Sequence, residues 1–194
     1  MTSKTLSIGL LALATLTACG EKDIILPGVR EPIRSDMVEV NSARPINLPA
    51  AQFNASWTHR NGAADHTVTQ PALAAQLSPI FAVNIGEGDD KSARITADPV
   101  VSGGLVYTLD ARSHVTAVTT GGAPVWTADI TPPTDMHTDA SGGGLAIGSG
   151  LLVVSTGYGT LTALDPATGG TVWVQELNAP GTSAPAVMGD LVYV

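Results

Sequence analysis

The stretch Ala163-Leu164-Asp165-Pro166-Ala167-Thr168-Gly169-Gly170-Thr171-Val172-Trp173 contains the most informative pattern in this chain of 194 residues. An apolar run ends at Asp165, whose carboxylate is suited to accept hydrogen bonds from the backbone of a turn. Pro166 fixes φ for that turn, and Gly169 can adopt the positive φ that closes it. The ring of Trp173 is large enough to reach a neighbouring sheet, where its N–H can find a carbonyl. We interpret the stretch as a strand, a turn and a second strand that carries a docking tryptophan.

Related segments recur along the chain with a period in the forties. Three pairs match: residues 104–107 with 150–153, 125–126 with 172–173, and 98–107 with 184–193. Their spacings are 46, 47 and 86 residues, and the last equals two periods of 43. Phe81 stands 45 residues before Trp126, in the place of a tryptophan. Short β runs that repeat at this spacing are typical of four-stranded propeller blades.

The composition favours the same all-β class. The chain has 21 Gly and 13 Pro, and only 13% of its residues are charged, so a helical bundle is excluded. The formal charge is −8 without any run of Lys or Arg, so neither nucleic acid nor an anionic membrane surface is an expected partner. A single cysteine rules out an internal disulfide and a zinc site built from several cysteines.

The first complete unit predicts four strands, at residues 98–102, 105–109, 114–118 and 124–128. Residues 132–144 form the longest insertion between units, and we expect an exposed loop there. Residues 55–57 are expected to enter the last blade and close the ring. The aspartates fall mostly in turn-like stretches, where solvated carboxylates are expected. The four histidines show no metal-binding spacing such as HExxH, so no metal ligand is predicted among His59, His66, His114 and His137.

Residues 1–18 read as a targeting signal. Lys4 supplies a positive start, and residues 6–16 form an apolar run that is too short to span a bilayer. The end, Leu16-Thr17-Ala18-Cys19, resembles the lipobox of bacterial lipoproteins. That resemblance implies cleavage before Cys19 and lipidation of its thiol. Residues 19–50 follow as a Pro-rich tether, and residues 51–194 form the folded body.

The docking stretch resembles the tryptophan-docking motif of PQQ-like, quinoprotein-type β-propeller repeats. The motif residues are Trp126, Ala163, Asp165, Gly169 and Trp173. Together with the lipobox and the tether, they make the chain most similar to the BamB-like family of outer membrane assembly lipoproteins. This resemblance implies eight blades, of which the chain holds about three, so we expect it to be the N-terminal part of an incomplete propeller.

The same resemblance implies a function without catalysis or a cofactor. It implies a lipid-anchored scaffold of the β-barrel assembly machinery, on the periplasmic side of the outer membrane of a Gram-negative bacterium. The implied partners are a BamA-type outer membrane assembly protein and nascent outer membrane proteins, bound through propeller loops and strand edges. The alternative is a PQQ-dependent dehydrogenase, or a degenerate quinoprotein-like propeller with a binding or sensory role.

Overall fold

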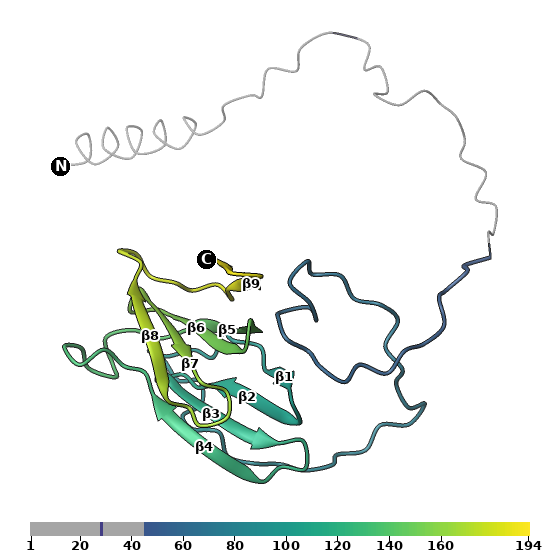
Figure 1. Ribbon diagram of the computed structural model, residues 1–194, viewed down its shortest axis with the longest axis horizontal. Helices are drawn as coiled ribbons and strands as arrows, with labels where there is room; N and C mark the ends of the chain where they lie inside the picture. The colour runs from purple at the N-terminus through teal and green to yellow at the C-terminus, as the bar shows by residue number, and fades with distance from the viewer. Residues whose placement is uncertain (1–27, 29–44) are drawn as a thin grey trace, which may run out of the picture. The chain divides into compact units, whose positions relative to one another are not determined.

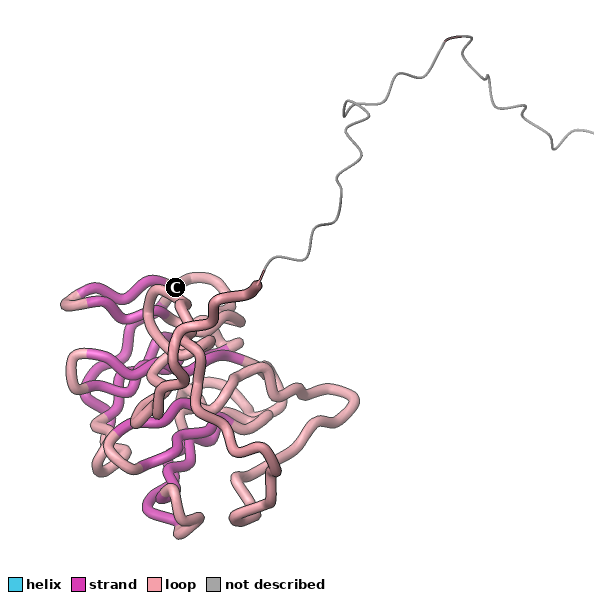
Figure 2. Tube along the Cα trace, turned by 90° about the vertical axis from the view of Figure 1, so that its right-hand side faces the viewer, coloured by secondary structure: helices cyan, strands magenta, loops and turns pink. Residues whose placement is uncertain are grey.

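The computed structural model describes Gly28 and residues 45–194, and the strands all lie within the unit Ile46–Val194 (Figure 1). Figure 2 shows this part of the chain as strands and loops without an α-helix. Accordingly, no helix long and apolar enough to cross a membrane occurs among the described residues. The predicted signal, residues 1–18, and the lipidation site Cys19 lie outside the described residues. The all-β prediction is confirmed.

Two antiparallel four-stranded sheets and one hairpin make up this unit. The first sheet has the order β1-β2-β3-β4, with β1 at Val100–Ser102, β2 at Leu105–Leu109, β3 at His114–Thr119 and β4 at Pro124–Asp129. The second has the order β5-β6-β7-β8, with β5 at Gly143–Gly148, β6 at Leu151–Thr156, β7 at Thr160–Leu164 and β8 at Thr171–Glu176. The hairpin pairs β9 at Ala186–Met188 with β10 at Leu191–Tyr193.

The sheets repeat one another in detail, which confirms the period found in the sequence. In the first sheet the β3–β4 register shifts between Ala117 and Val118, and in the second the β7–β8 register shifts between Ala163 and Leu164. These irregularities are 46 residues apart. The β9–β10 hairpin stands where β1 and β2 stand in the first sheet. The four-stranded meander and this repetition identify each sheet as a propeller blade.

The outermost strand of each sheet is its least buried strand. Every residue of β7 is buried, whereas the outer strands β4 and β8 bury none of theirs fully. One apolar cluster joins the two sheets and includes Val100, Leu109, Leu145 and Leu152. A second cluster joins the second sheet to the hairpin through Ala146, Val153 and Val187. The hydrophobic core therefore lies between successive blades and draws on their first three strands.

Two boundaries differ from the sequence prediction by two residues each. The first strand begins at Val100 rather than at residue 98, because Pro99 has no N–H to contribute to the ladder and Asp98 pairs with Arg60 instead. The predicted loop 132–144 ends two residues early, since Gly143 and Gly144 belong to the buried start of β5. A Cβ on Gly144 would collide with the backbone of Ala184, so only a glycine allows this close approach.

Residues 45–99 form loops beside the sheets, with isolated bridges but no strand (Figure 1). Within them, Trp57 exchanges two backbone hydrogen bonds with Val101 of β1, at 2.7 and 2.8 Å. Further along, the carbonyl of Thr58 accepts the N–H of Ile147 in β5, at 2.8 Å. In the described part of the chain the segment thus runs along inner strands, whose edge N–H and C=O groups are free to pair. The entry of residues 55–57 into a last blade stays a prediction.

Candidate functional site

The docking tryptophan of the first sheet lies against the turn that joins β7 to β8 in the second sheet. Trp126 in β4 donates its Nε1–H to the carbonyl of Pro166, at 3.0 Å. Tyr107 in β2 donates its hydroxyl to the same carbonyl, at 3.1 Å, and the two aromatic rings have centroids 5.9 Å apart. A Cβ on Gly169 would lie 2.6 Å from Cε3 of Trp126, so the indole covers the bare face of this glycine.

The turn that receives Trp126 is built as the sequence pattern suggests. Asp165 accepts the N–H of Ala167 at its carboxylate, at 2.8 Å, and the N–H of Gly169 at its carbonyl, also at 2.8 Å. Gly169 has a φ of +75°, a conformation that L side chains rarely adopt. Ala163 is fully buried in β7 opposite Trp173. Trp173 packs against the cluster that joins the second sheet to the hairpin.

Phe81 repeats this arrangement one blade earlier. A Cβ on Gly122, which has a φ of +87°, would lie 2.6 Å from Cγ of Phe81. Gly122 and Gly169 are 47 residues apart, and Phe81 and Trp126 are 45 residues apart. An aromatic ring on a positive-φ glycine of the following turn is thus the recurring contact between units, even though Phe81 lies outside any strand.

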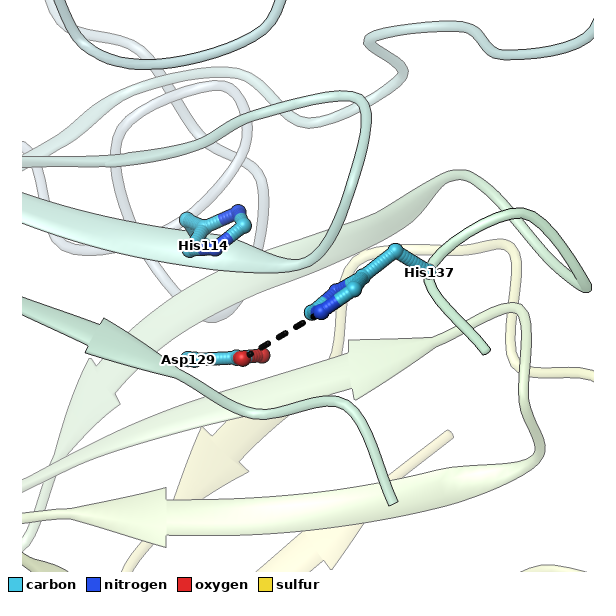
Figure 3. Close-up of side chains that lie close together, drawn as sticks. All are labelled: His114, Asp129 and His137. Carbon is cyan, nitrogen blue, oxygen red and sulfur yellow. Dashed lines mark ion pairs between the residues drawn. The ribbon is translucent and has the colours of Figure 1, made fainter. Parts of the chain in front are cut away.

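A second group of side chains gathers at the other end of the first sheet. His114 at the start of β3 and Asp129 at the end of β4 are register partners across the sheet. His137, from the loop between β4 and β5, stacks on His114 with ring centroids 5.5 Å apart and an interplanar angle of 14°. Its Nε2 lies 3.8 Å from Oδ2 of Asp129 (Figure 3). One possible ligand atom from each of the three residues lies within 4.8 Å of the others.

Neighbouring groups fix the orientation of these three side chains. Asp110 lies 3.2 Å from Nδ1 of His114, and Thr131 bonds Nδ1 of His137 at 3.0 Å. The N–H of Thr131 also donates to Asp129, at 2.9 Å. Although burial alone would raise the pKa of Asp129, the hydrogen bonds from Thr131 and the nearby imidazoles lower it below its usual value. The carboxylate is therefore held in its ionised form.

Two side chains at equivalent positions of the two blades donate hydrogen bonds to the loop that carries His137. Arg112 donates to the carbonyl of His137 at 3.2 Å, and Tyr158 donates to the carbonyl of Met136 at 2.7 Å. Arg112 and Tyr158 are 46 residues apart, at the same turn of successive blades. The loop is thus anchored to both sheets next to the group of His114 and Asp129.

The sequence did not predict this group, and it misjudged Asp110. Residues 114, 129 and 137 have no motif spacing, and only the β3–β4 register brings the first two together. Asp110 is 2% exposed rather than solvated, and it accepts the N–H groups of Glu87, Arg112 and His114. A polar residue at the start of one predicted strand and another at the end of the next strand lie side by side in an antiparallel pair. This is the signal that could have indicated the group.

Low pH is expected to weaken the contacts of Asp90. Hydrogen bonds from Ser92 and Ala93, with a smaller contribution from Arg112, lower the pKa of Asp90 from 3.8 to about 2. Because the folded pKa is depressed, the stabilisation is complete above about pH 4 and is lost as the pH falls toward 2. Thermal melts of the wild type and Asp90→Asn should therefore differ most near pH 5 and converge near pH 2. A difference that stays constant over this range would contradict the assignment.

Mild acid is expected to weaken the contact of His59 with the inner strands. His59 is 3% exposed, and its Nε2 accepts the N–H of Val187 in β9, at 3.0 Å. Burial lowers the pKa of His59 from its usual 6.5, so the folded state favours the neutral ring. The contribution of His59 is complete above about pH 6.5 and declines as the pH falls below that value. Melts between pH 7.5 and 5 should show a smaller decline for His59→Gln than for the wild type, and an equal decline in both would contradict this contact.

Comparison with known proteins finds relatives of these repeats. A family model described as "Outer membrane protein assembly factor BamB" matches residues 111–194. The quinohemoprotein alcohol dehydrogenase of Comamonas testosteroni is 26% identical, with a TM-score of 0.54 over 71% of this chain and 22% of its own. The chain thus contains a BamB-like PQQ repeat region, and its sheets have the quinoprotein-type propeller fold. No curated protein matches the chain.

Two other solved structures match more weakly. The quinohemoprotein alcohol dehydrogenase ADHIIG of Pseudomonas putida HK5 is 28% identical, with a TM-score of 0.45 over 53% of this chain and 17% of its own. BamB from Moraxella catarrhalis is 19% identical, with a TM-score of 0.40 over 52% of this chain and 30% of its own. The chain spans less than a third of the length of each of these solved structures.

Proposed function

We propose that the protein is a non-catalytic, lipid-anchored scaffold of the machinery that assembles β-barrel proteins in the outer membrane. The observation that carries the proposal is the BamB family match over residues 111–194, which includes the whole second blade and its docking turn. Cys19, in its lipobox-like context, would hold the protein to the membrane by its lipid. Its partners would be a BamA-type protein and nascent outer membrane proteins on the periplasmic side.

The use of the acidic side chains supports a scaffold. A catalytic or calcium-binding carboxylate needs free oxygens directed at a ligand. Six of the described aspartates instead accept a backbone N–H of their own turn or of a neighbouring loop: Asp65, Asp89, Asp90, Asp110, Asp139 and Asp165. These carboxylates stabilise the ends of strands and loops, which is what a rigid binding platform requires.

The competing function is a PQQ-dependent dehydrogenase. The observation that favours it is the similarity to the alcohol dehydrogenase of Comamonas testosteroni. That similarity covers 22% of the dehydrogenase, and it concerns blades, a structure that both classes of protein use. A degenerate quinoprotein-like propeller with a binding or sensory role would use the same blades without the cofactor.

Co-isolation from the native membrane separates these functions. The protein, extracted in mild detergent with its lipid, is expected to bring down a BamA-type protein that mass spectrometry identifies. Cys19→Ser should leave the protein in the soluble fraction and reduce this recovery, because the anchor brings the partners together. Absence of any outer membrane assembly protein above the mock isolation would contradict the scaffold. Reduction of a dye by the purified protein with PQQ, calcium and an alcohol would establish the dehydrogenase.

A further inference from the structure

The group of His114, Asp129 and His137 combines three donors from separate segments of the chain. A tetrahedral ion with bonds of about 2.0–2.1 Å places its ligand atoms roughly 3.3 Å apart. The present separations are 3.8 Å between His137 and Asp129 and at most 4.8 Å over the group. Small side-chain rotations would bring the three ligand atoms to the spacing that the ion requires. From this geometry we propose that the three residues bind a divalent transition metal ion of the Zn²⁺ type.

The donor set decides which metal would bind. Two imidazole nitrogens and one carboxylate suit zinc and its first-row neighbours, whereas calcium and magnesium prefer oxygen ligands alone. Three protein ligands leave a fourth position for water. That position has access to solvent, because Asp129 and His137 are both exposed and His114 is only partly buried.

The surrounding hydrogen bonds resemble the outer shell of a metal site. Metal-binding histidines usually engage their second nitrogen with a carboxylate or another polar group, which fixes the ring and its tautomer. Asp110 does this at Nδ1 of His114, and Thr131 does it at Nδ1 of His137. In each ring Nδ1 is therefore occupied, and Nε2 is the nitrogen left to bind the ion.

The second blade shows that a blade does not need these residues. The positions of Asp110 and His114 correspond, 46 residues later, to Thr156 and Thr160. Their hydroxyl groups form a hydrogen bond with one another at 2.7 Å. The equivalent turn of the second blade is therefore bridged without a charge or an imidazole. The acid and the histidine in the first blade are thus additions to the fold, and the loop with His137 brings a further ligand to them.

Titration of the full chain in mild detergent with Zn²⁺ tests the proposal. We expect one saturable site by calorimetry, and Co²⁺ should give the visible absorption of an ion with nitrogen and oxygen ligands. Asp129→Asn and His137→Gln should each weaken Zn²⁺ binding by more than about tenfold, and Thr131→Val, which removes only an orienting group, by about tenfold. The matched controls Asp135→Asn and His66→Gln should leave the affinity unchanged.

Folding is checked separately, because Asp129 and His137 are about half exposed and their variants should melt like the wild type without metal. Added Zn²⁺ should raise the melting temperature of the wild type but not of His137→Gln. The proposal is overturned if the wild type takes up no Zn²⁺, or if Asp129→Asn and His137→Gln bind it as tightly as the two controls. The co-isolation experiment above is independent of either result.

Discussion

Replacing Asp110 by alanine is expected to lower the free energy of unfolding by about 3–5 kcal/mol. The carboxylate is 2% exposed and accepts three backbone N–H groups, from Glu87 at 2.9 Å, Arg112 at 2.8 Å and His114 at 2.7 Å. The variant leaves these donors without their partner in a partly buried place, and each unsatisfied group costs about 1–3 kcal/mol. Denaturant unfolding of the full chain, followed by tryptophan fluorescence, measures the loss.

Asp165→Ala is the matched control for this prediction. Asp165 also ends a strand, but its carboxylate accepts one N–H, that of Ala167, in an exposed setting. Its removal should cost about 1 kcal/mol, because water can replace the lost acceptor. Equal losses for the two variants would show that the buried network around Asp110 does not contribute as described. Asp110→Asn should fall between them, since the amide keeps one oxygen acceptor.

Gly169→Ala is expected to lower the free energy of unfolding by about 2–5 kcal/mol. A residue with a side chain at a φ of +75° costs about 1–2 kcal/mol. In addition, the new methyl group would lie 2.6 Å from Trp126, and such overpacking costs about 1–3 kcal/mol. Gly150→Ala is the control, because Gly150 has a φ of +77° but open space where its Cβ would stand. The control should lose only the backbone part, about 1–2 kcal/mol.

The repeating features of the fold were accessible from the sequence because they depend on local chemistry. The strands, the glycine at the docking turn and the place of Phe81 follow from spacing and from residues whose conformational preferences are strong. Gly169 illustrates this: its φ and its contact with Trp126 both follow from the turn that the sequence predicts.

The remaining features depend on contacts between distant segments. His114 and Asp129 meet only because β3 and β4 pair in one register, and His137 arrives on a loop without a regular structure. Trp57 pairs with β1 because inner strands offer free edges, which no local pattern in residues 55–57 reveals. Asp110 is buried because the backbone of Glu87 approaches its carboxylate, a contact between residues 23 positions apart.

The central structural claim is that an aromatic ring on one blade docks onto a bare glycine of the next. A double-mutant cycle with Trp126→Ala and Gly169→Ala tests it most directly. If the indole covers Gly169, then Gly169→Ala should cost no more than Gly150→Ala once Trp126 is alanine, and the two substitutions should be coupled by about 1–3 kcal/mol. Effects that add to within about 0.5 kcal/mol would contradict the docking.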